Sequence, residues 1–281
     1  MTVRAAEPQV IAGLHTSIWP GSGPVVVGLA GLTSTGAAMA PLAAAVPRAH
    51  VVAPDLRGRG GSQLLSGPPG LRAHAQDVAA LLRELDLGDV VLVGHSMGAY
   101  LAPLVAQEAP ERIHRLVLID GGIRPRQPPF MRPALVRAMF RRQLRGMDRD
   151  WPNLDAVARK GDFTTMLASR PDLQPAVMRM LHEELGGGDP PFRPRIAVEH
   201  AVADAVDTFF GPDVEPALDE LQVPADVLLA ANRKRDGQRP FISDRAAQQW
   251  QRRQPLLSVQ RLAGNHVTVL FAPEVAAAVT A

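Results

Sequence analysis

Short apolar runs alternate along this chain with segments of helical periodicity. Continuous apolar runs bounded by glycine or proline are typical of strands that are buried on both faces of a parallel sheet. Six runs occur, of which the last alternates more, as near a sheet edge: residues 25–29, 51–53, 89–93, 116–119, 227–231 and 258–262. The residues up to Pro20 predict an N-terminal hairpin. The alternation predicts an α/β fold with a doubly wound, mostly parallel sheet.

Helical segments lie between these runs and after the last of them. Residues 71–85 carry valine and leucine at helical spacing, and Gly88 is expected to close this helix. Residues 97–109 predict a second helix, which Pro103 should kink or end within its first turn. Residues 272–281 predict a terminal helix. Each of these segments is long enough to cover part of a sheet face.

A long segment between two core strands breaks the alternation. No buried strand is indicated from residue 124 to 210, and helical fragments are predicted at 134–144, 154–160 and 176–185. An insertion of this size predicts a helical cap (124–210) after the sixth strand, with residues 1–123 and 211–281 as the core. Its apolar side chains are the expected walls of a pocket: Phe130, Met131, Met139, Phe140, Phe163, Met166, Met178, Met180 and Leu181.

Composition excludes several classes of protein. The chain has 281 residues, of which 46% are apolar and 21% charged, so it is neither disordered nor too short for a full core. No window approaches about 20 uncharged apolar residues, which argues against a spanning helix. Residues 1–10 lack an apolar signal region, so we expect a cytoplasmic protein. The absence of cysteine excludes disulfides, thiolate zinc sites and a cysteine nucleophile.

The strongest chemical signal is the pentapeptide Gly-His-Ser-Met-Gly at residues 94–98. It directly follows an apolar strand and directly precedes a helix. A strand-to-helix turn this sharp needs small residues at Gly94 and Gly98, and it exposes Ser96 at the carboxyl edge of the sheet. The helix N-terminus behind the serine favours developing negative charge. Ser96 is therefore the candidate nucleophile, and His95 beside it is expected to pack into the scaffold.

The motifs together resemble the α/β-hydrolase fold family over nearly the whole chain. Pro-Asp-Leu-Arg-Gly-Arg-Gly-Gly-Ser at residues 54–62 resembles that family's loop after strand four, and Ser96 falls at its nucleophile position. The resemblance implies a histidine base just after the last strand. Of eight histidines, His266 alone follows a late strand and precedes the terminal helix. His266 is thus the expected general base.

Two aspartates are alternatives for the acid that orients this base. Many family members place it after the strand that follows the cap, where this chain has Asp236 in an arginine-rich loop with a spacing one residue longer than usual. Other members place it at the end of the preceding strand, where Asp120 is followed by Gly121 and Gly122. Both alternatives stay open, and we favour Asp120 because it lies directly at a strand end.

The resemblance also implies an oxyanion hole made of two backbone amides. One is the amide of Met97, after the nucleophile, and the other is that of Leu32, after the first core strand. Ala30 stands where the family usually has histidine, which puts the geometry of this loop in question. The implied chemistry requires no metal and no cofactor. A serine nucleophile argues against the dehalogenase and epoxide-hydrolase members, which use aspartate.

Basic residues are frequent in the predicted cap, although the formal net charge is only +2. We interpret them as a solvated helix face rather than a nucleic-acid or membrane surface, since no aromatic residues are interleaved with them. They are Arg124, Arg126, Arg132, Arg137, Arg141, Arg142, Arg145 and Arg149. The expected partner is a small, fairly apolar ester or lactone, without nucleic acid or membrane, and a homo-oligomer stays open.

The sequence thus predicts a serine hydrolase that cleaves a carboxylic ester or lactone through an acyl-enzyme on Ser96. A C–C bond hydrolase and an acyltransferase use the same machinery and are the alternatives within the fold. A non-catalytic ligand-binding member is the alternative of a different class, based on the departures at Ala30 and around Asp236.

Overall fold

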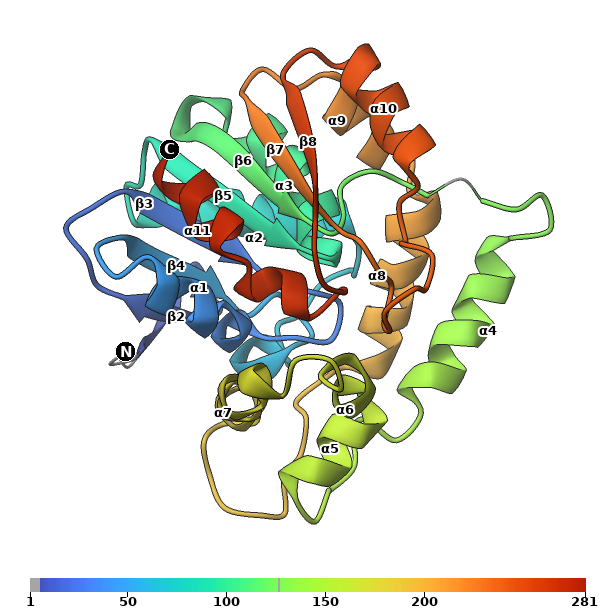
Figure 1. The fold of residues 1–281 in the computed structure, drawn as a ribbon. Helices are drawn as coiled ribbons and strands as arrows, with labels where there is room; N and C mark the ends of the chain where they lie inside the picture. Colours follow the sequence, from blue (N-terminus) through green and yellow to red (C-terminus); the bar gives the residue numbers. More distant parts are fainter. Residues whose placement is uncertain (1–5, 126) are drawn as a thin grey trace.

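One eight-stranded sheet runs through the centre of the protein (Figure 1). A computed structural model describes residues 6–125 and 127–281. The strand order is β1-β2-β4-β3-β5-β6-β7-β8, and β3 through β8 are mutually parallel. Their bounds are β3 Val25–Leu29, β4 His50–Pro54, β5 Val90–His95, β6 Ile113–Ile119, β7 Ala225–Ala230 and β8 Leu257–Leu262. All six predicted strands are confirmed, and the doubly wound α/β fold with them.

The first two strands form the predicted hairpin. β1 (Glu7–Ile11) pairs antiparallel with β2 (Leu14–Trp19), and β2 continues the sheet by pairing antiparallel with β4. Positive φ angles at Ala12 and Gly13, the two residues of the turn, match the right-handed twist of the flanking strands. At the other end of the sheet, β8 alternates buried and exposed positions, as its pattern predicts for an edge strand.

Helices cover both faces of the sheet, and a hydrophobic core fills each interface. One face is covered by α2 (Leu71–Glu84), α3 (Met97–Glu108), α9 (Val214–Asp219) and α10 (Asp244–Arg253). The other carries α1 (Ala40–Ala45) and the terminal α11 (Pro273–Thr280). Short 3-10 helices occur at η1 Gly36–Met39, η2 Gly60–Ser62, η3 Pro110–Arg112, η4 Pro171–Leu173 and η5 Thr268–Phe271.

Two details of these helices differ from the sequence expectation. The residue that adopts a left-handed conformation after α2 is Asp86, with φ +48°, and not Gly88. An aspartate tolerates this conformation because its short polar side chain can bond locally. Pro103 does not end α3, which continues to Glu108. The buried surroundings of α3 hold the helix together across the missing amide donor.

Among the described residues, six α-helices lie between β6 and β7. Five of them fall within the insertion that the sequence predicts: α4 Pro133–Leu144, α5 Leu154–Lys160, α6 Phe163–Met166, α7 Gln174–Glu184 and α8 Val198–Phe210. Three of them match the predicted fragments, whereas α6 and α8 were not predicted individually. The Asn153 side chain accepts a hydrogen bond from the Ala156 amide at 2.9 Å and so caps the start of α5. In Figure 1, α4 runs beside α8, and α5 to α7 lie beyond the edge of the sheet.

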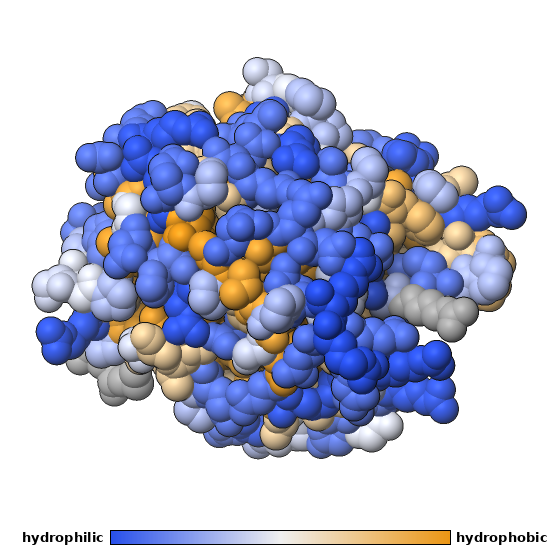
Figure 2. All heavy atoms as spheres, turned by 90° about the horizontal axis from the view of Figure 1, so that it is seen from above, coloured by the Kyte–Doolittle hydropathy of each residue, from blue (hydrophilic) through white to orange (hydrophobic). Residues whose placement is uncertain are grey.

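The surface in Figure 2 is mostly hydrophilic, with apolar side chains in separate patches. On the side of α4, Phe130, Leu135 and Met139 are exposed. Arg141 is exposed and pairs with the exposed Glu199, as expected for a solvated helix face. Arg124 departs from that expectation, because it is half-buried against the end of α8. Arg126 and residues 1–5 lie outside the described residues. No helix in the described ranges is long and apolar enough to cross a membrane.

Candidate active site

The carboxyl end of β5 turns sharply into α3 at Ser96. Ser96 has φ +56° and ψ −116°, a conformation that side chains rarely adopt. Glycine is required on both sides: a Cβ at Gly94 would lie 2.2 Å from the Gly98 carbonyl oxygen, and one at Gly98 would lie 2.1 Å from that of Leu29. The Ser96 amide donates to the Ile119 carbonyl at 2.9 Å, which ties the turn to β6. The turn has the strained strand-to-helix geometry that the pentapeptide predicts.

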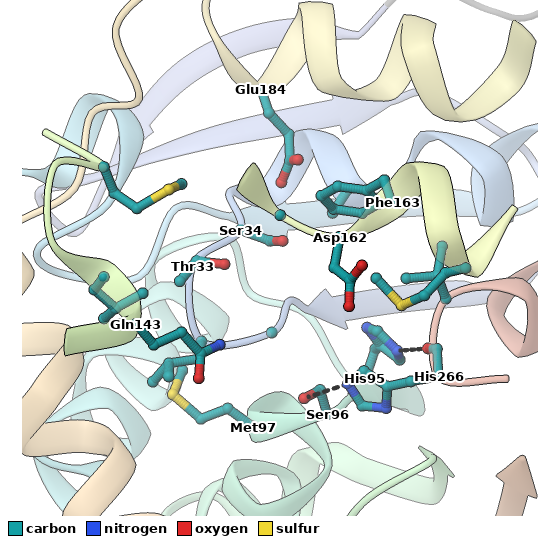
Figure 3. A pocket seen from close by; sticks show the side chains of 18 of the residues that line it. Thr33, Ser34, His95, Ser96, Met97, Gln143, Asp162, Phe163, Glu184 and His266 are labelled. Atoms are coloured by element: carbon teal, nitrogen blue, oxygen red, sulfur yellow. Dashed lines mark hydrogen bonds between the residues drawn. The ribbon is translucent and has the colours of Figure 1, made fainter. Parts of the chain in front are cut away.

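A chain of hydrogen bonds joins Ser96 to His266 and Asp120. His266 Nε2 lies 3.0 Å from Ser96 Oγ, as Figure 3 shows, and His266 Nδ1 lies 2.6 Å from Asp120 Oδ2. Because a carboxylate only accepts, Nδ1 carries the proton and Nε2 is left free to accept from the serine hydroxyl. The three groups come from the ends of β5 and β6 and from the loop after β8. This arrangement can deprotonate a serine hydroxyl.

Hydrogen bonds to β7 hold both the backbone and the side chain of Asp120 at the end of β6. Its side chain is 1% exposed, and its second oxygen, Oδ1, accepts from the Ala230 amide at 3.1 Å. Asp120 has φ +44°, and a Cβ at the following Gly121 would lie 2.4 Å from the Ser96 carbonyl oxygen. The glycine thus lets the end of β6 approach the turn at Ser96. Of the two alternative acids, the structure brings Asp120 to His266.

Asp236 lies elsewhere, in the exposed loop that follows β7. That loop folds on itself: the Asn232 side chain accepts from the Gly237 amide at 2.9 Å, and the Gln238 side chain accepts from the Lys234 amide at 3.2 Å. Lys234 also reaches back to Asp162 on the segment before α6, with 2.6 Å between Nζ and Oδ2. This ion pair joins the loop after β7 to the insertion beside the cavity.

Leu32 and Met97 both border the space above Ser96. Met97 is the first residue of α3, so its amide has no partner within the helix. Leu32 lies in a turn in which the Ser34 amide donates to the Gly31 carbonyl at 3.2 Å. The Leu32 carbonyl accepts from Nε and Nη2 of Arg59, at 3.0 and 2.9 Å. The two residues whose amides are predicted to form the oxyanion hole therefore line one cavity, and Arg59 holds the Leu32 loop through its carbonyl.

His95 packs against a neighbouring ring, as the sequence predicts, but that ring is His266, and His95 also borders the cavity. The two ring centroids lie 4.9 Å apart, and His95 Nε2 donates to the His266 carbonyl at 2.9 Å (Figure 3). Burial, followed by the charge of His266, lowers the pKa of His95 to about 4, so its ring is neutral at pH 7. The Phe241 ring packs edge-on against the His266 ring, with 5.1 Å between the ring centroids. Two rings thus hold the imidazole of His266.

The cavity above these residues has a volume of about 630 Å³ and is bounded by the insertion. Six of the nine predicted wall residues border it: Met139, Phe140, Phe163, Met166, Met180 and Leu181. The other three were wrong. Phe130 is 68% exposed, Met178 packs against the hydrophobic core, and Met131 lies apart from the cavity. An apolar helical residue has the same sequence signature whichever way it points.

Glu184 is one of the polar residues on the cavity wall that the sequence did not predict. Its Oε1 accepts from the Thr35 amide at 3.0 Å, and Figure 3 shows its carboxylate directed toward Ser34. Burial raises the pKa of Glu184 to about 7, and the hydrogen bonds from Thr35 and Ser34 oppose this rise only in part. A glutamate on an amphipathic helix carries no sequence signal for such a place.

No group of three or more His, Cys, Asp or Glu among the described residues is arranged to hold a metal ion.

Similarity to known proteins agrees with this geometry. Residues 12–279 match the family described as the alpha/beta hydrolase family. The lipase LipV of Mycobacterium tuberculosis is 34% identical over 143 residues, which cover 46% of this chain and 54% of the lipase. The chain thus spans about half the length of this curated relative.

Two solved structures superpose over almost their whole length. E-2-(acetamidomethylene)succinate hydrolase does so with a TM-score of 0.74 at 23% identity, covering 98% of both chains. A thermophilic esterase from Thermogutta terrifontis does so with a TM-score of 0.71 at 22% identity, covering 98% of this chain and 96% of the esterase. At these identities the likeness shows the fold. Since the family match extends from the hairpin to the last helix, this chain is a member of the alpha/beta hydrolase family.

Proposed function

We propose that this protein hydrolyses a carboxylic ester or lactone through an acyl-enzyme on Ser96. The observation that carries the proposal is the hydrogen-bonded chain from Ser96 through His266 to the buried Asp120, at the floor of a cavity. Nucleophile, base and orienting acid are within hydrogen-bond reach of one another, which is the geometry that acyl transfer needs. The partial match to a protein named a lipase supports an ester substrate.

In the proposed reaction, Ser96 Oγ attacks the carbonyl carbon while His266 Nε2 takes the hydroxyl proton. Asp120 keeps the imidazole in the required tautomer and stabilises it when it becomes charged. The amides of Leu32 and Met97 bind the oxyanion of the tetrahedral intermediate. His266 then delivers its proton to the leaving alcohol, and the acyl group stays on Ser96. A water activated by His266 attacks this acyl-enzyme and releases the acid.

The cavity supports a medium-sized substrate with an apolar part. Its thioether and phenyl walls favour acyl chains or rings, which gain roughly 25 cal/mol for each Å² removed from water. The insertion supplies most of these walls. We therefore assign residues 124–210 to a cap over a core made of residues 1–123 and 211–281, with residues 1–5 and Arg126 outside the described part of the chain.

The proposal is tested with a panel of aryl esters of increasing acyl length and a set of lactones, on the wild-type chain and on Ser96→Ala. We expect the wild type to hydrolyse members of the panel and Ser96→Ala to lose about 10⁴-fold or more in kcat. Binding of a substrate should persist in Ser96→Ala, because the cavity walls are unchanged.

Three results would contradict the proposal. Hydrolysis that survives in Ser96→Ala would show that another group is the nucleophile. Cleavage of vinylogous diketones with little action on esters would indicate a C–C bond hydrolase. Acyl transfer to an added alcohol that outcompetes water would indicate an acyltransferase.

A further inference from the structure

A buried arginine lies directly behind the Leu32 loop. Arg59 follows β4, its side chain is 1% exposed, and it forms an ion pair with the fully buried Asp204 of α8. The Asp204 carboxylate also accepts from His74 Nε2 at 3.0 Å and from the Gly70 amide at 2.7 Å. Burial alone would raise the pKa of Asp204, but the His74 hydrogen bond and the Arg59 charge lower it to about 2. Asp204 is therefore ionised at neutral pH opposite the guanidinium of Arg59.

The guanidinium of Arg59 contacts both residues whose amides form the proposed oxyanion hole. Nε and Nη2 donate to the Leu32 carbonyl at 3.0 and 2.9 Å, and Nη2 lies 3.8 Å from Met97 Sδ. Nη1 donates to the Arg57 carbonyl at 2.9 Å and to Asp204. The rigid, planar fork of the side chain thus fixes the Leu32 loop relative to α3 and α8. A lysine could not make this set of contacts.

The loop that carries Arg59 is itself joined to the end of the cap. The Gly60 amide donates to the Arg195 carbonyl at 2.7 Å, and the Ala197 amide donates to the Gly58 carbonyl at 2.7 Å. Arg59 and Ile196 form an isolated antiparallel bridge between these bonds. Residues 58–60 therefore lie between the segment that leads into α8 and the loop that carries Leu32.

We propose that Arg59 is a positioning residue for the oxyanion hole and that Asp204 on α8 holds it in place. The inference rests on the proposed hydrolysis, because an oxyanion hole matters only if a tetrahedral oxyanion forms at Ser96. Arg59 does not touch the substrate. It holds the Leu32 carbonyl, which belongs to the peptide that follows this residue, and so restrains the loop in which the Leu32 amide is directed toward the place where the oxyanion develops.

The same loop offers a matched control. Arg57 forms a two-point ion pair with Asp77, at 2.8 and 2.7 Å, and donates to the Ser66 carbonyl at 2.8 Å. Its side chain is also mostly buried, but it points to α2 and away from Leu32. Arg57→Met therefore removes a comparable ion pair from the same loop without altering the contacts to the oxyanion residues.

The experiment compares Arg59→Met with Arg57→Met in steady-state ester hydrolysis and in inhibition by an aryl boronic acid. Ser96 Oγ adds to boron, its proton passes to His266, and the resulting tetrahedral boronate anion places one oxygen in the oxyanion hole. We expect Arg59→Met to lower kcat by about 10- to 100-fold with KM changed less than about threefold, since a donor is loosened and not deleted. The boronate inhibition constant should rise by a similar factor.

Arg57→Met should leave both quantities within about threefold of the wild type. If Arg59→Met does not fold, Arg59→Lys takes its place, because it keeps the positive charge opposite Asp204. We expect Arg59→Lys to lower kcat as well, but by a smaller factor. Equal kcat and inhibition constants in the wild type and either Arg59 variant, or equal losses in the Arg57 variant, would overturn the inference while the hydrolysis stands. A folded wild type that neither hydrolyses esters nor binds the boronate would overturn the proposed function, and the inference with it.

Discussion

Replacing Asp120 by asparagine changes one atom at the centre of the proposed mechanism. Asp120 uses both carboxylate oxygens: Oδ2 lies 2.6 Å from His266 Nδ1, and Oδ1 accepts from the Ala230 amide at 3.1 Å. Asparagine has one oxygen and one NH₂ group for these two places. The Ala230 amide is a buried backbone donor, so the asparagine oxygen is expected to face it. The NH₂ group then faces His266 Nδ1.

This orientation reverses the tautomer of the base. His266 Nδ1 must now accept a proton, so Nε2 carries the hydrogen and cannot accept one from Ser96. The flipped amide would set two donors against each other at Ala230, which costs about 1–3 kcal/mol in a buried site. The anion that stabilises the imidazolium is lost in either orientation. We expect kcat to fall by about 10³- to 10⁴-fold, equivalent to ~4–5.5 kcal/mol in the barrier.

The assay is the rate of aryl-ester hydrolysis by Asp120→Asn and Asp236→Asn side by side, with thermal unfolding as the check that both are folded. Asp236 lies on an exposed loop, so its variant should retain wild-type kcat within about twofold. The reasoning is refuted if Asp120→Asn keeps more than about a tenth of the wild-type kcat. A loss in Asp236→Asn as large as that expected for Asp120→Asn would refute it equally.

Three further predictions follow from the buried titratable groups. His95→Phe keeps a ring beside His266 but removes the hydrogen bond to its carbonyl, so kcat for ester hydrolysis should fall about 3- to 10-fold; an unchanged kcat would contradict this positioning role. Glu184 has its pKa raised from the ordinary 4.5 to about 7, so its contribution to stability is present below pH 4.5 and is lost as the pH rises through 7. Glu184→Gln should therefore unfold in urea with a free energy about 1–2 kcal/mol higher than the wild type at pH 8 and equal at acid pH, the full shift being discounted for water in the cavity; the reverse pH order would contradict it. Asp204 has its pKa lowered from 3.8 to about 2, so the wild type should lose about 2 kcal/mol of unfolding free energy as the pH falls from about 4 to about 2, a loss that Asp204→Asn should lack.

Local patterns predicted most of the scaffold. Apolar runs of three to five residues predicted five of the parallel strands, because a strand buried on both faces is apolar at consecutive positions, and an alternating pattern predicted β8 at the edge. The turn at Ser96 was equally readable, since close backbone approaches admit only glycine at Gly94 and Gly98. His266 could be selected because, of the eight histidines, it alone follows a late strand, which is where the family resemblance places the base. These features depend on near neighbours in the chain or on the order of the elements.

Features that depend on distant contacts were not predictable in the same way. Whether Asp120 or Asp236 reaches His266 depends on where the loop after β7 comes to lie, and in that loop Asp236 is exposed, whereas Asp120 contacts the base. The Arg59–Asp204 ion pair joins residues 145 positions apart and is invisible in either local sequence. The His95 side chain is oriented by its hydrogen bond to the backbone carbonyl of His266, in the loop after β8. Such contacts decide which polar residues become functional.

The central claim is that Ser96 is a nucleophile activated by His266, and labelling with a fluorophosphonate tests it most directly. The serine oxygen displaces fluoride from phosphorus, its proton passes to His266, and the adduct is located by mass spectrometry of peptides. We expect one label, on Ser96, in the wild type and its loss in a folded His266→Ala variant. A folded wild type that stays unlabelled at Ser96, or a His266→Ala variant labelled at the wild-type rate, would contradict it.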